Sequence, residues 1–282
     1  MKISVFRPQL LLLLCAYIVS GCAHKSNRIS SIDDLKEKRI GVLQGSVHDI
    51  YATKTFPKAT ILQYKGPSDM ILAVKSGKID AGIYTSDELV ELMRRQPEIG
   101  IFGSPLFSSD LGLGFHKDNP ELRSAFNRFL KQIRSNGVYD DMVTRWMKNG
   151  DTRMPCVPKT EPGAPLVVGL VSDNGLPFTA VKDNRLVGFN IELLERFAAF
   201  SGRRITYLDM QFGSLIPALA SKKIDMIGAV MWITEERRTQ IDFSDPYYVQ
   251  GANFFALRKN IVSQGEQSEP KRQDVMRSLL PR

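Results

Sequence analysis

The sequence predicts an α/β protein whose two lobes enclose a cleft. Short apolar runs typical of buried strands alternate with amphipathic segments on both sides of a stretch at 150–165 that contains four prolines. Such alternation builds open, mostly parallel sheets, and no regular element survives that density of proline. We therefore expect one α/β lobe before this stretch and one after it. Open sheets bind ligands at the carboxyl ends of their strands, so the cleft is the expected ligand site.

An internal similarity supports two lobes built on one plan. The stretch LAVKSGKIDAGIY (72–84) parallels LASKKIDMIGAVM (219–231). Each contains a helix end, a tight turn, Ile-Asp and an apolar strand. Helix–turn–Asp–strand is also a common element, so chance is the alternative explanation.

The N-terminal segment 1–21 is expected to be a secretory signal. Lys2 and Arg7 precede the run LLLLLCAYIVSGC, which ends in small residues and Cys22. A basic start followed by a short apolar run is typical of such signals. The run is shorter than the roughly 20 residues that span a bilayer comfortably, and a short membrane anchor is the alternative. Residues 22–30 would follow as a polar tether.

The segment 31–118 is expected to form the lobe that comes first along this chain. Ser31 is placed to cap a helix over Asp34, and Ser68 is placed to cap a helix that a glycine ends. The expected strands are RIGVLQG, ATILQY, KIDAGIY and LGLGFHKD, and the expected helices are SDMILAVKSG and SDELVELMRRQ.

The segment 119–149 is expected to hold two helices. The first is long and amphipathic, with Pro120 near its start and Gly137 past its end. A linker at 150–164 then leads to the second lobe at 165–259, and the polar, charged tail at 260–282 is expected to be disordered. The expected strands of the second lobe are PLVVGLV, RITYLDM, IDMIGAVM and GANFFALRK, and its helices are FNIELLERFAAFSG and SLIPALASKK.

Charge and cysteine content exclude several classes of function. The net charge of +8 is spread along the chain, which indicates a solvated surface or weak attraction to anionic lipid. No basic helix with interleaved aromatics indicates nucleic-acid binding. Cys156 would be the one cysteine outside the signal and Cys22, so an intramolecular disulfide is excluded. No CxxC or His–Cys cluster offers a metal site, and we expect no metal and no cofactor.

In the strand and helix sequences quoted above for both lobes, the chain resembles the extracellular solute-binding proteins of the polar amino-acid uptake type, family three. These are two-lobed periplasmic receptors for ABC importers. The matching stretches cover nearly everything from 31 to 259, and the run ITEERRTQIDFSDPYY at 233–248 is the most specific. The resemblance implies a periplasmic-binding-protein-like fold with a hinge, a monomer without enzymatic activity, and an ABC permease as partner. The ending IVSGC resembles the lipobox of bacterial lipoproteins, which implies lipidation of Cys22 and a membrane anchor on the periplasmic side of the cell envelope.

The order of the parts differs from that of the family. There, the part like 165–259 comes first as lobe 1, the part like 31–118 follows as lobe 2, and the part like 119–149 ends the chain by packing back on lobe 1. Here lobe 2 precedes lobe 1, so the resemblance implies a circular permutation in which the linker joins the old ends. Permutation is tolerated where termini are exposed and close. A remnant of a tandem array that pairs with another copy is the alternative.

The resemblance also implies a ligand site. Arg237 would bind the carboxylate of an amino acid or related acid, because a guanidinium matches a carboxylate with two parallel hydrogen bonds. A salt bridge to Glu192 or Asp242 is the alternative role. Phe178 and Phe212 would sandwich the side chain of the ligand, and Asn190 would hydrogen-bond to its far end. Thr234 would contact the carboxylate beside Arg237. The turn Gln44-Gly45-Ser46 would direct its backbone N–H groups at an anion.

Three positions depart from the family pattern around the ligand's ammonium group. The lobe 2 aspartate expected after the Asp80 strand is Thr85 here, and Asp87 lies two residues further on. Val230 and Trp232 stand where small or hydroxylated residues are usual. A buried ammonium without a counter-charge costs several kcal/mol. Either the ligand lacks that amine, or Asp87 substitutes, or the pocket does not bind an amino acid.

Two other functions remain open at this point. Periplasmic dehydratases share such lobes, and Glu192 or Asp173 could supply the acid, although no nucleophile–base pair stands out. A sensory or ligand-free module that contacts a membrane partner is the other alternative, which the altered ammonium positions favour.

Overall fold

The computed structural model describes residues 28–158 and 163–262. The expected signal, Cys22, most of the tether and nearly all of the C-terminal tail lie outside the described residues. Within the described ranges, no helix combines the length and apolar character that a bilayer span requires.

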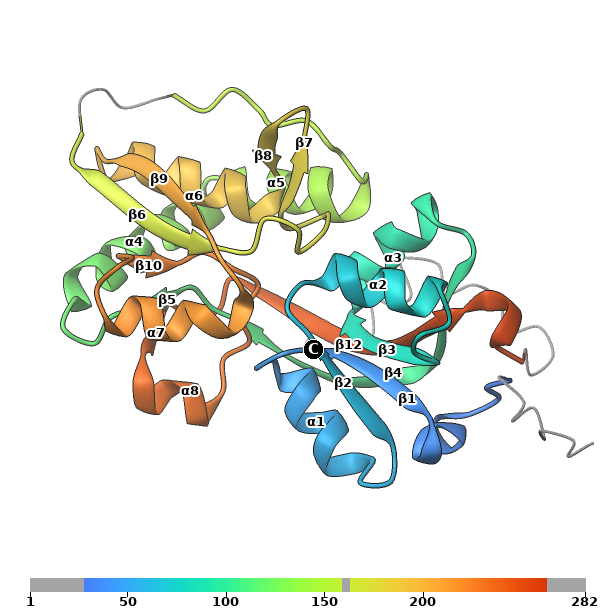
Figure 1. Ribbon diagram of the computed structural model, residues 1–282. Coiled ribbons are helices and arrows are strands. Elements are labelled where there is room, and N and C mark those ends of the chain that lie inside the picture. The colour runs from blue at the N-terminus through green and yellow to red at the C-terminus, as the bar shows by residue number, and fades with distance from the viewer. Residues whose placement is uncertain (1–27, 159–162, 263–282) are drawn as a thin grey trace, which may run out of the picture.

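Lobe 2 is built on a five-stranded mixed sheet in the order β2-β1-β3-β12-β4 (Figure 1). Strands β1, β2 and β3 run parallel, whereas β12 is antiparallel to both of its neighbours. Helix α1 packs on one face of the sheet and helices α2 and α3 on the other. The bounds are η1 (Ile32–Glu37), β1 (Arg39–Leu43), α1 (Val47–Thr55), β2 (Thr60–Tyr64), α2 (Pro67–Lys75), β3 (Ala81–Thr85), α3 (Ser86–Arg95), β4 (Ile99–Leu111), β12 (Tyr248–Leu257) and η4 (Arg258–Asn260).

Lobe 1 is built on a second five-stranded mixed sheet in the order β11-β5-β10-β6-β9. Strands β10, β6 and β9 are parallel, and β5 is antiparallel to β10 and β11. A separate hairpin, β7–β8, lies beside it (Figure 1). The bounds are β5 (Gly114–Phe115), β6 (Pro165–Leu170), β7 (Ala180–Lys182), β8 (Arg185–Val187), α6 (Phe189–Phe200), β9 (Arg204–Asp209), η3 (Phe212–Ser214), α7 (Leu215–Ala220), β10 (Met226–Ile227), α8 (Glu235–Gln240) and β11 (Asp242–Phe243).

The two lobes are joined by β4 and β12. These strands pair antiparallel from Tyr248–Leu111 to Leu257–Ile99, and the register shifts near Ala252. After Leu111 the chain enters β5 of lobe 1, and β12 brings it back from lobe 1 into the sheet of lobe 2. The pair therefore occupies the position of a hinge between the lobes (Figure 1).

The structure corrects three sequence expectations about these elements. The sheets are mixed rather than mostly parallel, because β12 and β5 enter them antiparallel. Lobe 2 was expected to run to residue 118, but β5 at Gly114–Phe115 already pairs within the sheet of lobe 1. Strand β12 was counted with lobe 1 and lies in the sheet of lobe 2.

Two helix starts show how local sequence sets the boundaries. Ser31 and Asp34 form the expected capping box of η1. Helix α2 begins two residues earlier than expected, with Gly66 rather than Ser68 at its N-cap. Pro67 explains the shift, because its fixed φ suits the first helical position, where no N–H partner is needed.

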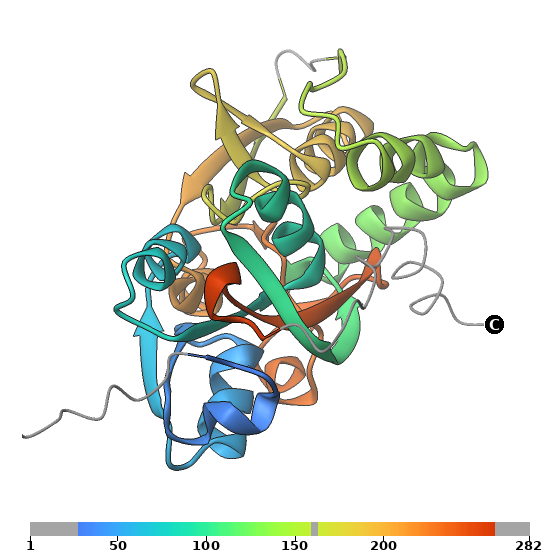
Figure 2. The same cartoon turned by 90° about the vertical axis from the view of Figure 1, so that its right-hand side faces the viewer.

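The segment expected to hold two helices packs on lobe 1. It contains α4 (Pro120–Ser135), α5 (Val138–Val143) and the π-helical turn η2 (Thr144–Lys148). Figure 2 shows these helices beside α6. The rings of Phe126 and Phe197 meet edge to face at 5.1 Å, and Arg145 donates two hydrogen bonds to Glu192 at 3.0 and 2.7 Å.

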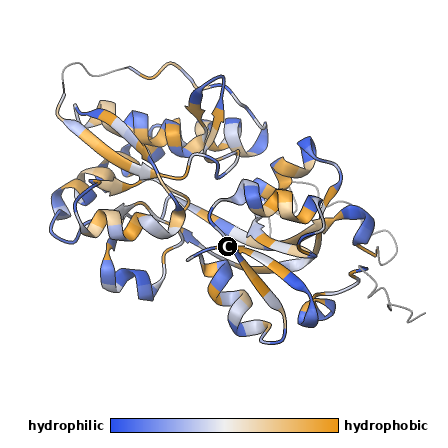
Figure 3. Ribbon diagram, viewed as in Figure 1, coloured by the Kyte–Doolittle hydropathy of each residue, from blue (hydrophilic) through white to orange (hydrophobic). Residues whose placement is uncertain are grey.

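The largest apolar cluster runs through both lobes. It joins Phe254 on β12 to Phe56, directly after α1, and, at the other end, Phe126 and Phe189 in lobe 1. Apolar residues accordingly concentrate along the strands and inner helix faces, whereas α8 is hydrophilic (Figure 3). The continuous core makes the two sheets one packed unit around the hinge.

Candidate functional site

A small cavity lies where the two lobes meet. Its volume is about 20 Å³, which is room for about one water molecule. It is bounded by the β1–α1 turn and the end of β3 from lobe 2, and by two loops and α8 from lobe 1. The lining residues are Leu43, Ser46, Val47, His48, Tyr84 and Thr85 from lobe 2, and Asn174, Phe212, Val230, Trp232 and Arg237 from lobe 1.

Arg237 lies across the boundary between the lobes. Thr234 caps α8 by accepting a hydrogen bond from the Arg237 amide at 3.2 Å, which fixes the start of this short helix. The guanidinium donates to the Trp232 carbonyl oxygen at 2.8 Å and, in lobe 2, to the Gly45 carbonyl oxygen at 3.2 Å. It also lies 5.3 Å from the centre of the Phe212 ring.

Arg237 is buried with its charge. Its exposed fraction is 7%, and burial lowers the pKa of its guanidinium to about 10, so it is cationic at neutral pH. Among the described residues no carboxylate forms an ion pair with it. Glu192 and Asp242, the two carboxylates considered from sequence as partners of Arg237, pair with other arginines. Glu192 pairs with Arg145 and Asp242 with Arg123.

The turn at 44–46 does not direct its N–H groups at the cavity. The Gln44, Gly45 and Ser46 amides donate to the Tyr64 carbonyl oxygen, the Asp49 carboxylate and the Leu43 carbonyl oxygen. Gly45 has a φ of +73°, a conformation that glycine adopts without strain. This conformation turns the Gly45 carbonyl oxygen toward Arg237, so the turn presents an acceptor rather than the expected donors.

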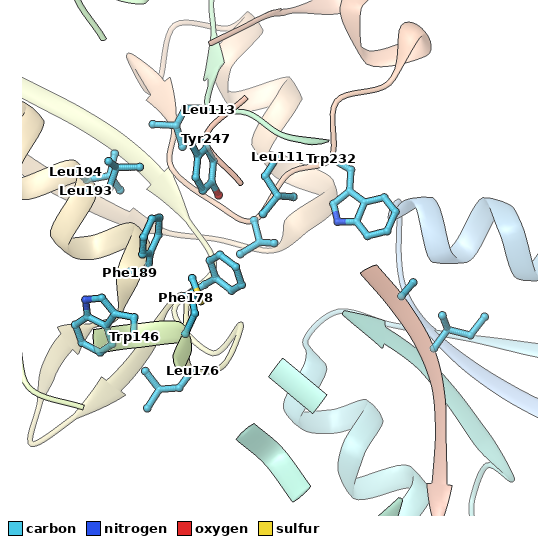
Figure 4. Packing of buried hydrophobic residues seen from close by; sticks show 14 of the residues in the cluster. Leu111, Leu113, Trp146, Leu176, Phe178, Phe189, Leu193, Leu194, Trp232 and Tyr247 are labelled. Carbon is cyan, nitrogen blue, oxygen red and sulfur yellow. The ribbon is translucent and has the colours of Figure 1, made fainter. Parts of the chain in front are cut away.

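Aromatic side chains fill most of the space between the lobes. His48 on α1 meets the Trp232 ring edge to face at 5.4 Å, and Phe107 on β4 lies 5.2 Å from Trp232 and 6.1 Å from His48. In Figure 4 the indole of Trp232 points away from the core of lobe 1 toward α1. Trp232 therefore occupies volume that a ligand would otherwise take.

His48 was not predicted from the sequence. Both of its ring nitrogens and the Trp232 Nε1 are buried without a hydrogen-bond partner among the described residues. Burial, assisted by the charge of Arg237, lowers the pKa of His48 to about 3, so the imidazole is neutral. The available signal was its place two residues after Ser46, at the start of the helix that follows the predicted turn.

Two candidates lie away from the cavity. Phe178 is fully buried in lobe 1, 5.4 Å from the Tyr248 ring and 6.1 Å from the Phe189 ring (Figure 4). Asn190 is also fully buried and donates to the Gly228 carbonyl oxygen at 3.2 Å. Neither borders the cavity in this closed arrangement.

Thr85, the last residue of β3, and Asp87, in the first turn of α3, lie differently relative to the cavity. Thr85 borders the cavity, whereas Asp87 does not and accepts a hydrogen bond from the Tyr248 hydroxyl at 3.0 Å. The next residue, Glu88, was not predicted. Its carboxylate accepts from Asn174 of lobe 1 at 2.9 Å and from Gln250 at 2.8 Å, and burial raises its pKa to about 8.

The acids considered for an enzyme are not gathered at the cavity. Glu192 is fully buried in lobe 1 and binds Arg145, Trp146 and Arg196. Asp173 lines a more open pocket of about 320 Å³ between α2, α3 and the loop at 173–176. In the part of the chain that the structure describes, no three His, Cys, Asp or Glu side chains cluster as a metal site would require.

Comparison with known proteins identifies the family. The model of the bacterial extracellular solute-binding proteins, family 3, matches residues 36–149 and 166–276. A probable histidine-binding protein of Campylobacter jejuni is 41% identical over 87 residues, which is 31% of this chain and 34% of that protein. The arginine-binding extracellular protein ArtP of Bacillus subtilis is 42% identical over 94 residues, 33% of this chain and 36% of that protein.

A solved structure of an ancestral arginine-binding protein bound to arginine is 44% identical over 30% of this chain and 38% of that one, with a TM-score of 0.29. The chain thus spans about a third of the length of the relatives it matches at this identity. The family model, by contrast, matches most of the chain, in one segment on each side of the linker. This chain belongs to the bacterial extracellular solute-binding proteins, family 3.

Proposed function

We propose that this protein binds an amino acid or a related small carboxylate between its lobes and delivers it to an ABC importer. The observation that carries the proposal is Arg237, a buried cation at the interlobe cavity without an anionic partner among the described residues. The relatives named as histidine-binding and arginine-binding proteins support this class of ligand, as does the family.

The energetics of burial favour an anion at this place. Removing a cation from water costs several kcal/mol unless hydrogen bonds and an opposite charge compensate. The two carbonyl oxygens that Arg237 contacts supply hydrogen bonds but no charge. A ligand carboxylate would supply both, at about 1.5–3 kcal/mol for each charged hydrogen bond.

The proposed function includes attachment to the cell envelope. The run ending in IVSGC supports a lipoprotein signal with Cys22 as the lipidated residue, and more than one acyl chain gives stable anchoring. The family is one of extracellular solute-binding proteins, which supports a location outside the cytoplasm. Substitution Cys22→Ala is expected to release the protein from the membrane fraction of cells.

The proposed receptor is a circular permutant. The two ends of the described fold support this, because Ile29 and Ile261 form a parallel bridge and the Val262 amide donates to the Ile29 carbonyl oxygen at 2.8 Å. In the family order, the chain would pass directly from this end of lobe 1 into lobe 2. The separate family matches on each side of the linker agree with the same interpretation.

The test is binding of amino acids and organic acids to the purified full-length protein, measured by calorimetry and thermal shift. Substitution Arg237→Gln is expected to weaken binding of any ligand found by about a hundredfold, the value of one charge-assisted contact. Arg238→Gln is the matched control, because Arg238 is half-exposed and pairs with Glu235 at 3.5 Å. Equal loss in both variants, or a ligand that binds Arg237→Gln normally, would contradict the proposal.

A ligand-free module is the second candidate. The aromatic contact of His48 with Trp232 and the cavity of about 20 Å³ favour it, because side chains of both lobes occupy space that a ligand would need. If no acid binds while the protein is folded, this candidate replaces the first one. The named relatives are binding proteins, and no catalytic activity is proposed.

A further inference from the structure

The cavity between the lobes has one formal charge, and it is positive. Of its eleven lining residues, Arg237 alone is charged at neutral pH, because His48 is neutral with a pKa near 3. No aspartate or glutamate borders the cavity among the described residues. The electrostatic environment therefore favours an anion and offers nothing to compensate a cation.

Several polar side-chain atoms at the cavity have no hydrogen-bond partner and can donate hydrogen bonds to a ligand. The Trp232 indole is a donor only, and its Nε1 is buried and unpartnered within the described structure. A neutral imidazole offers one donor and one acceptor, and both nitrogens of His48 are likewise buried and unpartnered there. The Thr85 hydroxyl, which can donate and accept, is also buried and unpartnered within the described structure. Unsatisfied buried groups of this kind are costly. Because each of these three side chains can donate, a ligand with hydrogen-bond acceptors would satisfy them.

The acidic residues of lobe 2 nearest the cavity along the chain are already engaged. Asp87 accepts from the Tyr248 hydroxyl, and Asp49 accepts from the Gly45 amide and from Gln63. Both carboxylate oxygens of Glu88 accept from amide groups, and its pKa of about 8 leaves it mostly uncharged at neutral pH. An ammonium group entering the cavity would meet no free carboxylate from lobe 2.

The volume of the cavity sets a limit on ligand size. The indole of Trp232 and the imidazole of His48 meet across the space at 5.4 Å. A long side chain would have to separate these rings and break the contact of Arg237 with Gly45 at 3.2 Å. A ligand of a few heavy atoms also exceeds the space of about one water molecule, but it requires less displacement of these side chains than a longer one.

We infer that the site takes small carboxylates that lack an ammonium group, such as glycolate and L-lactate, rather than amino acids. The carboxylate would lie against Arg237, and a hydroxyl would reach His48 or Trp232. This inference rests on the proposed function, since it assigns the ligand class of the same site.

The experiment compares two matched pairs of ligands on the full-length protein by calorimetry. Glycolate and glycine differ only in hydroxyl against ammonium, as do L-lactate and L-alanine. The hydroxy acids are expected to bind about a hundredfold tighter or more, because the unpaired ammonium is costly to bury. Binding of glycine, L-alanine or L-histidine as tightly as the hydroxy acids would overturn the inference and leave the proposed function standing.

The opposite failure is distinguishable. If no acid of either kind binds while circular dichroism and melting show a folded protein, both the inference and the proposed function are overturned. A variant tests the physical cause separately. Thr85→Asp places a carboxylate beside the cavity and is expected to narrow or reverse the preference for the hydroxy acid. Thr60→Asp, the same change at an exposed position on β2 away from the cavity, is the matched control and keeps the preference. A preference that is unchanged in a folded Thr85→Asp protein would contradict the inference.

Discussion

Arg237 and Glu88 are buried ionisable residues at the lobe boundary that keep different charge states. The guanidinium keeps its charge with a pKa of about 10, whereas burial raises the pKa of the Glu88 carboxyl to about 8. Both make hydrogen bonds that cross between the lobes, Arg237 to Gly45 and Glu88 to Asn174. Closure of the lobes is therefore connected to the ionisation of single residues.

Glu88 gives the stability of the protein a pH dependence with a defined sign. The folded protein keeps the Glu88 proton up to about pH 8, whereas a carboxyl with the ordinary pKa of 4.5 releases it earlier. This stabilisation is complete below pH 4.5 and is lost as the pH rises to about 8. The lowered pKa of His48 has the opposite sign, because its contribution is present above pH 6.5 and is lost as the pH falls toward 3.

Between about pH 7 and 8 the contribution of Glu88 dominates, because unfolded His48, with its ordinary pKa of 6.5, is already mostly deprotonated there. The free energy of unfolding is expected to fall over this range by up to about 1.4 kcal/mol per pH unit. Urea denaturation at several pH values measures it. Glu88→Gln is expected to remove the fall, and Glu91→Gln on the same helix, where Glu91 pairs with Arg94 and Arg95, is expected to keep it. A fall that persists in Glu88→Gln would contradict the assignment.

The sequence identified some residues of the candidate site and missed others for a physical reason. Arg237, Trp232 and Thr85 were found because each lies in a short stretch that resembles a motif of the family, so the resemblance implies its place at the ligand site. His48 and Glu88 were missed because their roles depend on partners in the other lobe, Trp232 and Asn174. Contacts between segments so far apart leave no pattern in one sequence.

At the scale of elements, Glu192 attaches the closing helices to lobe 1. This fully buried carboxylate on α6 accepts from Arg145 at 2.7 Å and from the Trp146 Nε1 at 2.6 Å, both in η2, and from Arg196 at 2.8 Å on its own helix. Each oxygen accepts at least two hydrogen bonds. The π-helical turn η2 therefore docks on α6 through one charged group.

Removing that charge is expected to weaken the docking of the closing helices. Glu192→Gln would leave two arginines with no buried counter-charge, and breaking such a pair costs about 3–5 kcal/mol. We expect a loss near 3 kcal/mol in urea denaturation, because both arginines are about a quarter exposed, at 21% and 25%. Asp141→Asn is the control, since Asp141 pairs with the same Arg145 from an exposed position and is expected to cost less than about 1 kcal/mol. Similar losses in both variants would show that burial of Glu192 is not the cause.

Most helices and strands could be predicted from sequence, but the helices α1 and α8 and the strand β4 were not predicted. Its 13 residues include Gly103, Pro105 and three serines, a composition that disfavours strands. The structure explains how they are tolerated, because β4 is the edge strand of its sheet and proline is accepted at sheet edges. The hinge was therefore invisible in the local pattern, although its partner β12 was predicted.

At the scale of the molecule, the lobes are closed on each other by side chains. The contacts that cross the boundary include His48 with Trp232, Arg237 with Gly45, and the Tyr84 hydroxyl with the Asn174 carbonyl oxygen at 2.5 Å. These contacts resemble those that a bound ligand would provide in a closing receptor. The equilibrium between open and closed forms should then depend on Trp232.

Trp232→Ala is expected to open the unliganded protein. The substitution removes the ring contacts of Trp232 with His48 and Phe107 of lobe 2. Each is worth about 0.5–1.5 kcal/mol, so together they shift a two-state equilibrium by about tenfold or more. Small-angle X-ray scattering should then give a larger radius of gyration for Trp232→Ala than for the wild type. Phe200→Ala is the control, because Phe200 is 42% exposed on α6, away from the cavity. An unchanged radius in Trp232→Ala would show that the aromatic contact does not hold the lobes together.

The order of the lobes along the chain can be tested by reversing it. If this protein is a re-cut form of one two-lobed domain, then a chain that starts at Gly163, continues through Val262 and a flexible connection of about eight residues to Ile29, and ends at Pro158 should fold. The new connection is short because Ile29 and Ile261 already pair, and the new cut lies between the elements that end at Lys148 and begin at Pro165. Its melting temperature should lie within a few degrees of that of the native order, since every contact within the two sheets is kept.

A chain cut inside α6, between Glu195 and Arg196, is the control, and it is expected to lose the cooperative melting transition because the cut divides the helix that carries Glu192. Light scattering separates the rival explanation. A remnant of a tandem array would need a second copy, so the native and rearranged chains would both be dimers. A rearranged chain that is unfolded, or native and rearranged chains that are both dimeric, would contradict the permutation, because a re-cut single domain holds both of its lobes in one chain.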